Sequence, residues 1–112
     1  MTTHPREIID RQLRAYNARD LEAYCALFAC DAVISRLNDG EEIARGMDAI
    51  RAYYTARFKG PGLHCRIKAR IELDSFVIDH EQVTGITGGL LEVVAIYEVR
   101  DALIQSLRII WP

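Results

Sequence analysis

The sequence predicts an α+β protein in which three N-terminal helices pack against a mixed, mostly antiparallel β-sheet. Before residue 60, apolar residues recur at the three- and four-residue spacing of amphipathic helices. After residue 62, apolar and polar residues alternate, most strictly over residues 63–73. The last stretch, residues 90–111, has the pattern of a long hairpin whose connection is Arg100, Asp101 and Ala102.

Two helices are expected to form a helical hairpin near the start of the chain. The first begins after Pro5, a residue suited to a first helical turn, and runs through Arg19. Gln12 is a polar interruption of its apolar stripe. Asp20 is suited to cap the second helix. The buried face of this second helix is expected to comprise Leu21, Tyr24, Cys25, Leu27 and Phe28.

A short β-hairpin and a third helix are expected next. Residues 32–37 and 41–45 favour two strands, and the Asn38-Asp39-Gly40 sequence between them is a strong turn signal. Gly46 precedes the third helix, residues 48–59, which Gly60-Pro61-Gly62 is expected to end.

Four long strands complete the expected sheet. Residues 63–73 and 76–84 form two of them, joined by a turn at Asp74-Ser75, and a glycine-rich loop at residues 85–89 leads into the final hairpin. The buried face of the first of these strands is expected to carry Leu63, Cys65, Ile67, Ala69, Ile71 and Leu73.

The final hairpin is apolar on both faces. Its inner face is expected to carry Val93, Ala95, Tyr97, Val99, Leu103, Gln105, Leu107, Ile109 and Trp111. Its outer face carries Val94, Ile96, Ile104 and Ile110. A contiguous apolar outer face would be unfavourable in water, so a homodimer through that face is expected.

Composition narrows the classes of function. The 112 residues, half of them hydrophobic, are expected to form one domain spanning residues 1–112. A net charge of −2 does not favour nucleic-acid binding. With no long apolar run and a polar segment at residues 1–5, no membrane contact and a cytoplasmic location are expected. The three cysteines and three histidines lack metal-ligand spacing, which predicts reduced thiols and neither a metal nor a cofactor.

Three segments resemble a known superfamily: YNARDLEA at residues 16–23, LFACDAV at 27–33 and GMDAIRAYY at 46–54. With the order of elements, they are similar to the nuclear transport factor 2-like superfamily, in its branch near ketosteroid isomerases and SnoaL-like polyketide cyclases. The resemblance implies a curved sheet wrapped around the three helices into a cone, a cystatin-like roll with an apolar pocket, and a homodimer.

The isomerase's catalytic residues do not carry over to this sequence. By the motif spacing, the resemblance puts the family's tyrosine donor at Gln12, its aspartate base at Arg36 and its protonated aspartate near Ala95. An amide, a guanidinium and a methyl group cannot take a proton from carbon and stabilise the resulting oxyanion. Ketosteroid isomerase activity is therefore not expected.

The candidate ligand-binding residues combine the resemblance with side-chain periodicity. They are Gln12, Tyr16, Arg36, Tyr54, Phe58, Ala95, Tyr97 and Trp111. Gln12 fits a structural hydrogen bond as well as a ligand contact, and Arg36 fits an exposed strand position as well as a pocket position that needs a carboxylate partner. The ligand implied is a small apolar molecule with a carbonyl or carboxylate oxygen, whereas His64 and His80 are expected to be exposed.

Three functions remain open from the sequence. The first is a small-molecule-binding protein with an apolar pocket, favoured by the missing acid and base. The second is an enzyme of isomerase, cyclase or hydrolase/dehydratase type, working without a metal on a small apolar substrate. The third is a structural dimerisation domain, which a filled, dry cone would favour.

Overall fold

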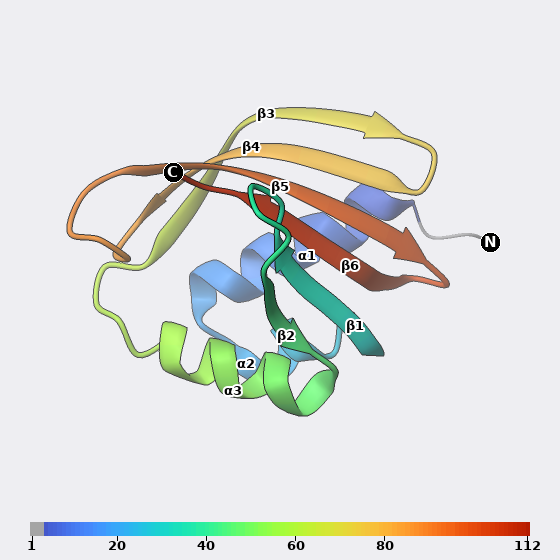
Figure 1. Ribbon diagram of the computed structural model, residues 1–112, viewed down its shortest axis with the longest axis horizontal. Helices are drawn as coiled ribbons and strands as arrows, with labels where there is room; N and C mark the ends of the chain where they lie inside the picture. Colours follow the sequence, from blue (N-terminus) through green and yellow to red (C-terminus); the bar gives the residue numbers. More distant parts are fainter. Residues whose placement is uncertain (1–3) are drawn as a thin grey trace.

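The computed structural model describes residues 4–112, so part of the polar N-terminal segment, residues 1–3, lies outside the described residues. Two helices come first, two strands separate them from the third helix, and four more strands of the same sheet follow (Figure 1). The elements in chain order are α1 (Pro5–Ala18), α2 (Leu21–Cys25), β1 (Phe28–Arg36), β2 (Glu42–Arg45), α3 (Met47–Arg57), β3 (His64–Leu73), β4 (Phe76–Thr84), β5 (Leu91–Arg100) and β6 (Leu103–Ile110).

The six strands form one sheet in the order β2-β1-β6-β5-β4-β3. Every neighbouring pair is antiparallel except β1 and β6, which are parallel. In Figure 1 the three helices lie on the same side of this sheet. The expected α+β class and mixed, mostly antiparallel sheet are therefore confirmed.

The segment that follows α1 fixes the helices to the sheet. The side-chain amide of Asn17 donates to the carbonyl oxygen of Cys65 and accepts from the Cys65 N–H, at 2.9 and 2.8 Å. Arg19, in the left-handed conformation that ends α1, donates to the carbonyl oxygen of Leu63. Asp20 caps α2 by accepting from the N–H of Ala23, as its position in the sequence predicts.

The second helix is shorter than expected. It ends at Cys25, and Phe28, predicted on its buried face, is instead the first residue of β1. Ile104 explains the difference, because it pairs with Phe28 and its N–H donates to the carbonyl oxygen of Leu27. Pairing with β6 thus takes precedence over the helical pattern of the local sequence.

Two β-bulges move residues to the face opposite the one predicted. In β3 the pairing with β4 passes from Ile67 to Ala69, so Lys68 is the extra residue and the alternation reverses beyond it. Ile71 and Leu73, predicted inside, are 61% and 74% exposed. In β6 the pairing with β5 skips Gln105, and Ile104, predicted on the outer face, is fully buried.

The outer face of the sheet carries an apolar row that crosses three strands. Ile71, Ile78 and Ile96 are consecutive cross-strand partners on this face, and Val94 and Ile110 pair beside them. None of the helices covers this side in Figure 1. The bulge in β3 adds Ile71 to the apolar residues that the sequence pattern placed there.

We expect this outer face to mediate a homodimer. If five side chains from each chain lost about 50 Å², at roughly 25 cal/mol per Å², their burial would contribute on the order of 10 kcal/mol before association costs. Sedimentation at micromolar concentration should give a dimer, and Ile78→Lys should give a folded monomer. A monomeric parent protein would contradict the expectation.

Candidate functional site

A cavity of about 330 Å³ lies between the helices and the inner face of the sheet. It is enclosed by residues of α1, α2 and α3 and of the strands β3, β4, β5 and β6. Among the residues predicted from the sequence, those that line it are Gln12, Tyr16, Tyr54, Ala95, Tyr97 and Trp111. The sequence pattern therefore brings most of the predicted residues to one place.

Aromatic side chains from all three helices form one wall of the cavity. The rings of Tyr24 and Tyr54 are 4.4 Å apart between centroids, and Tyr16 meets Tyr54 edge-on at 6.4 Å. Phe58, also predicted as a ligand-binding residue, does not line the cavity but packs edge-on against Tyr16 at 5.5 Å. Phe58 thus supports the wall from behind.

Gln12 is 5% exposed, and its side-chain amide donates to the hydroxyl of Tyr24 at 3.3 Å. Of the two interpretations of this buried amide, the structural hydrogen bond is present, although its partner lies on α2 and not on the sheet. Gln12 also lines the cavity.

Glu81 is the ionisable residue at the floor of the cavity, and sequence reasoning missed it. It is 8% exposed, and the hydroxyl of Tyr97 donates to its carboxyl at 3.3 Å. Burial, and next the nearby charge of Asp79, raise the pKa of Glu81 to about 7. The carboxyl therefore exchanges its proton near neutral pH.

The signal for Glu81 was present in the alternation of β4. Val77, Asp79, Glu81 and Val83 occupy every second position and are all buried. Two acidic residues in step with two valines indicate an inward-facing polar site, because a carboxylate on a buried face must find partners. The residue of β4 singled out from the sequence was instead the neighbouring His80.

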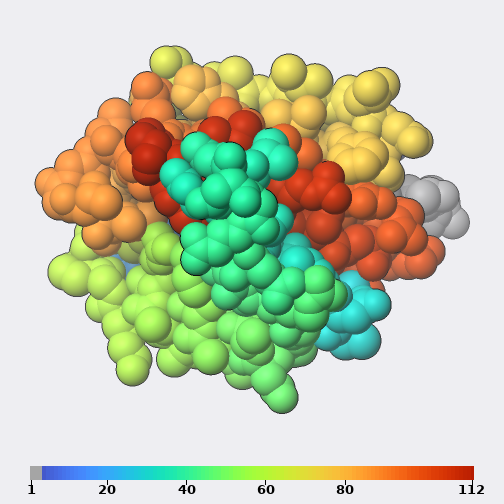
Figure 2. Space-filling view, viewed as in Figure 1, coloured from blue at the N-terminus to red at the C-terminus, as the bar shows by residue number. Residues whose placement is uncertain are grey.

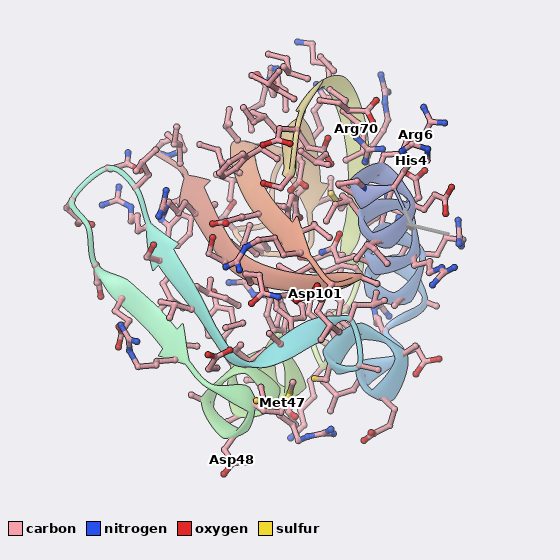
Figure 3. All side chains as sticks on the ribbon, turned by 90° about the vertical axis from the view of Figure 1, so that its right-hand side faces the viewer. His4, Arg6, Met47, Asp48, Arg70 and Asp101 are labelled. Carbon is pink, nitrogen blue, oxygen red and sulfur yellow. The ribbon has the colours of Figure 1, made fainter. Side chains whose placement is uncertain are left out.

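Asp79 lies next to Glu81 on the same face and is completely buried. Arg70 binds it in a bidentate pair, with N–O distances of 2.6 and 2.9 Å. The third nitrogen of Arg70 donates to Asp10 of α1 at 2.7 Å. Figure 3 shows Arg70 beside the N-terminal half of α1. Arg70 faces inward only because of the bulge at Lys68.

Arg36 does not line the cavity, so its predicted place there is wrong. Its guanidinium pairs with Asp39 at 2.8 Å and donates to the carbonyl oxygen of Trp111 at 3.0 Å. It also lies 5.6 Å from the Trp111 ring centroid. In Figure 2 the segment between β1 and β2, in teal and green, covers part of the dark-red C-terminal residues. Arg36 thus contacts Trp111 without lining the cavity, and its carboxylate partner is a protein one.

The cation that does line the cavity is Arg57, near the end of α3. Its guanidinium donates to the hydroxyl of Tyr53 and lies 5.2 Å from the Tyr53 ring centroid. The most exposed lining residues, Ile86, Thr87 and Pro112, mark the mouth. The loop at the mouth approaches the backbone of Leu63 closely at Gly85. Only glycine allows this approach, because a Cβ there would lie 2.5 Å from the backbone nitrogen of Leu63.

The remaining polar candidates lie away from the cavity. His64 is exposed, and His80 contacts Glu92 at 3.0 Å on the outer face. Among the described residues, no three His, Cys, Asp or Glu side chains are grouped as metal ligands would be. Cys25, Cys30 and Cys65 are free thiols, and burial raises the pKa of Cys65. No helix within residues 4–112 is both long enough and apolar enough to cross a membrane.

The fold and its enclosed cavity are those of the cone-shaped, nuclear transport factor 2-like class of α+β proteins. Residues 9–107 match the model of the SnoaL-like domain, and the chain belongs to this family. The resemblance stated from the sequence motifs is thereby confirmed. Among curated proteins, no match to the chain was found.

Solved structures agree with this class. A cystatin-fold protein from Novosphingobium aromaticivorans has a TM-score of 0.86 and 23% identity, over 96% of this chain and 98% of that one. An epoxide hydrolase from M. tuberculosis, described as LEH-like, has a TM-score of 0.83 and 18% identity, over 96% of this chain and 82% of that one. A protein from Catenulispora acidiphila with a ketosteroid isomerase-like fold, bound to trimethylamine, has a TM-score of 0.78 and 19% identity, over 96% of this chain and 85% of that one. At these identities the likeness shows the fold alone.

Proposed function

We propose that this protein binds a small, mostly apolar molecule in its cavity and exchanges a proton with it through Glu81. The observation that carries the proposal is a buried carboxyl, with a pKa of about 7, at the floor of an aromatic cavity. Perturbed carboxyls in enclosed pockets are typical of binding and catalytic sites. A cavity of about 330 Å³ has room for a ligand of one or two rings, whereas a structural dimerisation domain is expected to have a filled interior.

The chemistry of Glu81 defines what the ligand must offer at the floor. Below pH 7 the protonated carboxyl donates a hydrogen bond to a carbonyl oxygen, and above pH 7 the carboxylate accepts one from a hydroxyl group. The apolar wall selects a hydrocarbon body, while Tyr97 adds a hydroxyl beside Glu81 and Gln12 adds an amide to the cavity lining.

Binding of 4-cyclohexylcyclohexanone tests the proposal, because its single carbonyl needs a donor. Calorimetry should show affinity falling by about tenfold or more between about pH 5.5 and pH 8.5, as Glu81 loses its proton. In Glu81→Gln the amide donates at every pH, so the affinity should not change with pH. The exposed Glu72→Gln should behave as the parent. A pH-independent affinity in the parent, or an unchanged pH profile in Glu81→Gln, would refute the role of Glu81.

A second candidate function, catalysis of proton transfer, is favoured by the same carboxyl. Ionised Glu81 is suited to take a proton from a carbon beside a carbonyl group and to return it. Exchange of the α-hydrogens of the bound ketone in D2O, followed by NMR, should be accelerated by the parent and not by Glu81→Gln. Ketosteroid turnover remains unexpected, since Gln12 and Ala95 stand at the two family positions that line the cavity.

A further inference from the structure

The cavity has ionisable groups at two ends. Glu81 is 8% exposed and belongs to the floor, with the buried Tyr97 and Cys65 beside it. Arg57 is partly exposed and belongs to the mouth, where Tyr53 is its neighbour. Tyr16 lines the same cavity, where burial raises the pKa of its hydroxyl, the charge of Arg57 lowers it and that of Glu81 raises it.

Arg57 has no acidic partner in the described part of the chain. The arginines that do form ion pairs there are Arg36, Arg45, Arg51, Arg70 and Arg100. The only side-chain acceptor of Arg57 in residues 4–112 is the neutral hydroxyl of Tyr53. A guanidinium has five N–H donors in a planar fork, and that fork matches the two oxygens of a carboxylate.

We propose that the ligand is a small apolar carboxylic acid, whose carboxylate pairs with Arg57 at the mouth and whose far end reaches Glu81 at the floor. The inference rests on the proposed function and adds the chemical class of the ligand. It corrects the expectation that Arg36 supplies the positive charge, because that charge is already paired with Asp39. The aromatic wall between the two ends contacts the hydrocarbon body.

The order of polar groups also sets the orientation of the ligand. A carboxylate at the floor would lie beside Glu81 and close to Asp79, where like charges oppose binding. A carboxylate at the mouth lies beside a cation and keeps contact with water. The far end of the ligand is therefore the one that carries a hydroxyl or carbonyl oxygen, or none.

The test compares 4-cyclohexylcyclohexanecarboxylate with its primary amide, which has the same shape without the charge. By calorimetry at neutral pH and low salt, the parent protein should bind the acid about tenfold more tightly than the amide, as a charge-assisted hydrogen-bonded pair contributes. Arg57→Gln should bind the two equally, and Arg57→Lys should keep part of the preference. Arg51→Gln also removes one positive charge from α3, but outside the cavity, so this variant should keep the full preference for the acid over the amide.

The ketone 4-cyclohexylcyclohexanone separates this inference from the proposed function. It should bind equally well to the parent and to Arg57→Gln, which shows that the variant keeps its cavity. Binding of the ketone without a preference for the acid, or a preference that survives in Arg57→Gln, would overturn the carboxylate assignment alone. Failure of all three probes to bind the parent would overturn the proposed function with it.

Discussion

Arg70→Gln should lower the free energy of unfolding by about 3–5 kcal/mol, the usual cost of leaving one member of a buried ion pair without its partner. Asp79 is completely buried, and both of its carboxylate oxygens bind Arg70. Removing the guanidinium leaves that charge inside the protein without compensation. Urea unfolding at one protein concentration measures the loss.

The double variant Arg70→Gln/Asp79→Asn tests the cause. It replaces the ion pair by two amides that can bond to each other, so no buried charge remains, and Asp10 is half-exposed and free to contact water. The double variant should therefore be more stable than Arg70→Gln alone. If it is less stable than Arg70→Gln, the unpaired charge of Asp79 is not what destabilises the single variant.

Much of the fold follows from local sequence patterns. Pro5 and Asp20 begin helices where their chemistry predicts, and the connection at Asp101 and Ala102 is the expected tight turn, with φ values of 56° and 60°. The order of the helices and strands was also predictable. These features depend on residues close in sequence, for which propensity and spacing are direct evidence.

The errors come from long-range pairing. A strict alternation over residues 63–73 contains no sign that Lys68 is an extra residue, yet the bulge decides which of Arg70 and Ile71 faces the interior. A shift of one residue exchanges the two faces of a strand. The consequence for the site is large, because it is the bulge that turns Arg70 toward Asp79.

The candidate site was predictable where it follows periodicity and not where it depends on partners. Tyr97 and Ala95 line the cavity because they alternate on β5, and Gln12 because it lies on a helical stripe. The position of Arg36 was inferred from motif spacing, which says nothing of the nearby Asp39. Glu81 follows the alternation, but its importance depends on a cavity that only the assembled fold contains.

Burial of Glu81 should make the protein less stable as pH rises. Its pKa is raised from 4.5 to about 7, so the folded state binds more protons than the unfolded state between these values. The stability that this group contributes is fully present below about pH 4.5 and is lost as pH rises through 7. The shift corresponds to about 3 kcal/mol, since one pKa unit is worth about 1.4 kcal/mol.

At about pH 8, Glu81→Gln should therefore have a free energy of unfolding up to about 3 kcal/mol larger than that of the parent, measured by urea unfolding. This difference should disappear at about pH 4.5. The amide fills the same space and cannot ionise, so the difference between the two proteins isolates this one carboxyl. Glu72→Gln, at an exposed position of β3, controls for the removal of a negative charge. Glu81→Gln should also lose the pH dependence of ketone binding, because one carboxyl is responsible for both effects. A parent protein as stable as Glu81→Gln at pH 8 would mean that Glu81 ionises without cost, and the proton exchange near neutral pH on which the proposed function depends would then be wrong.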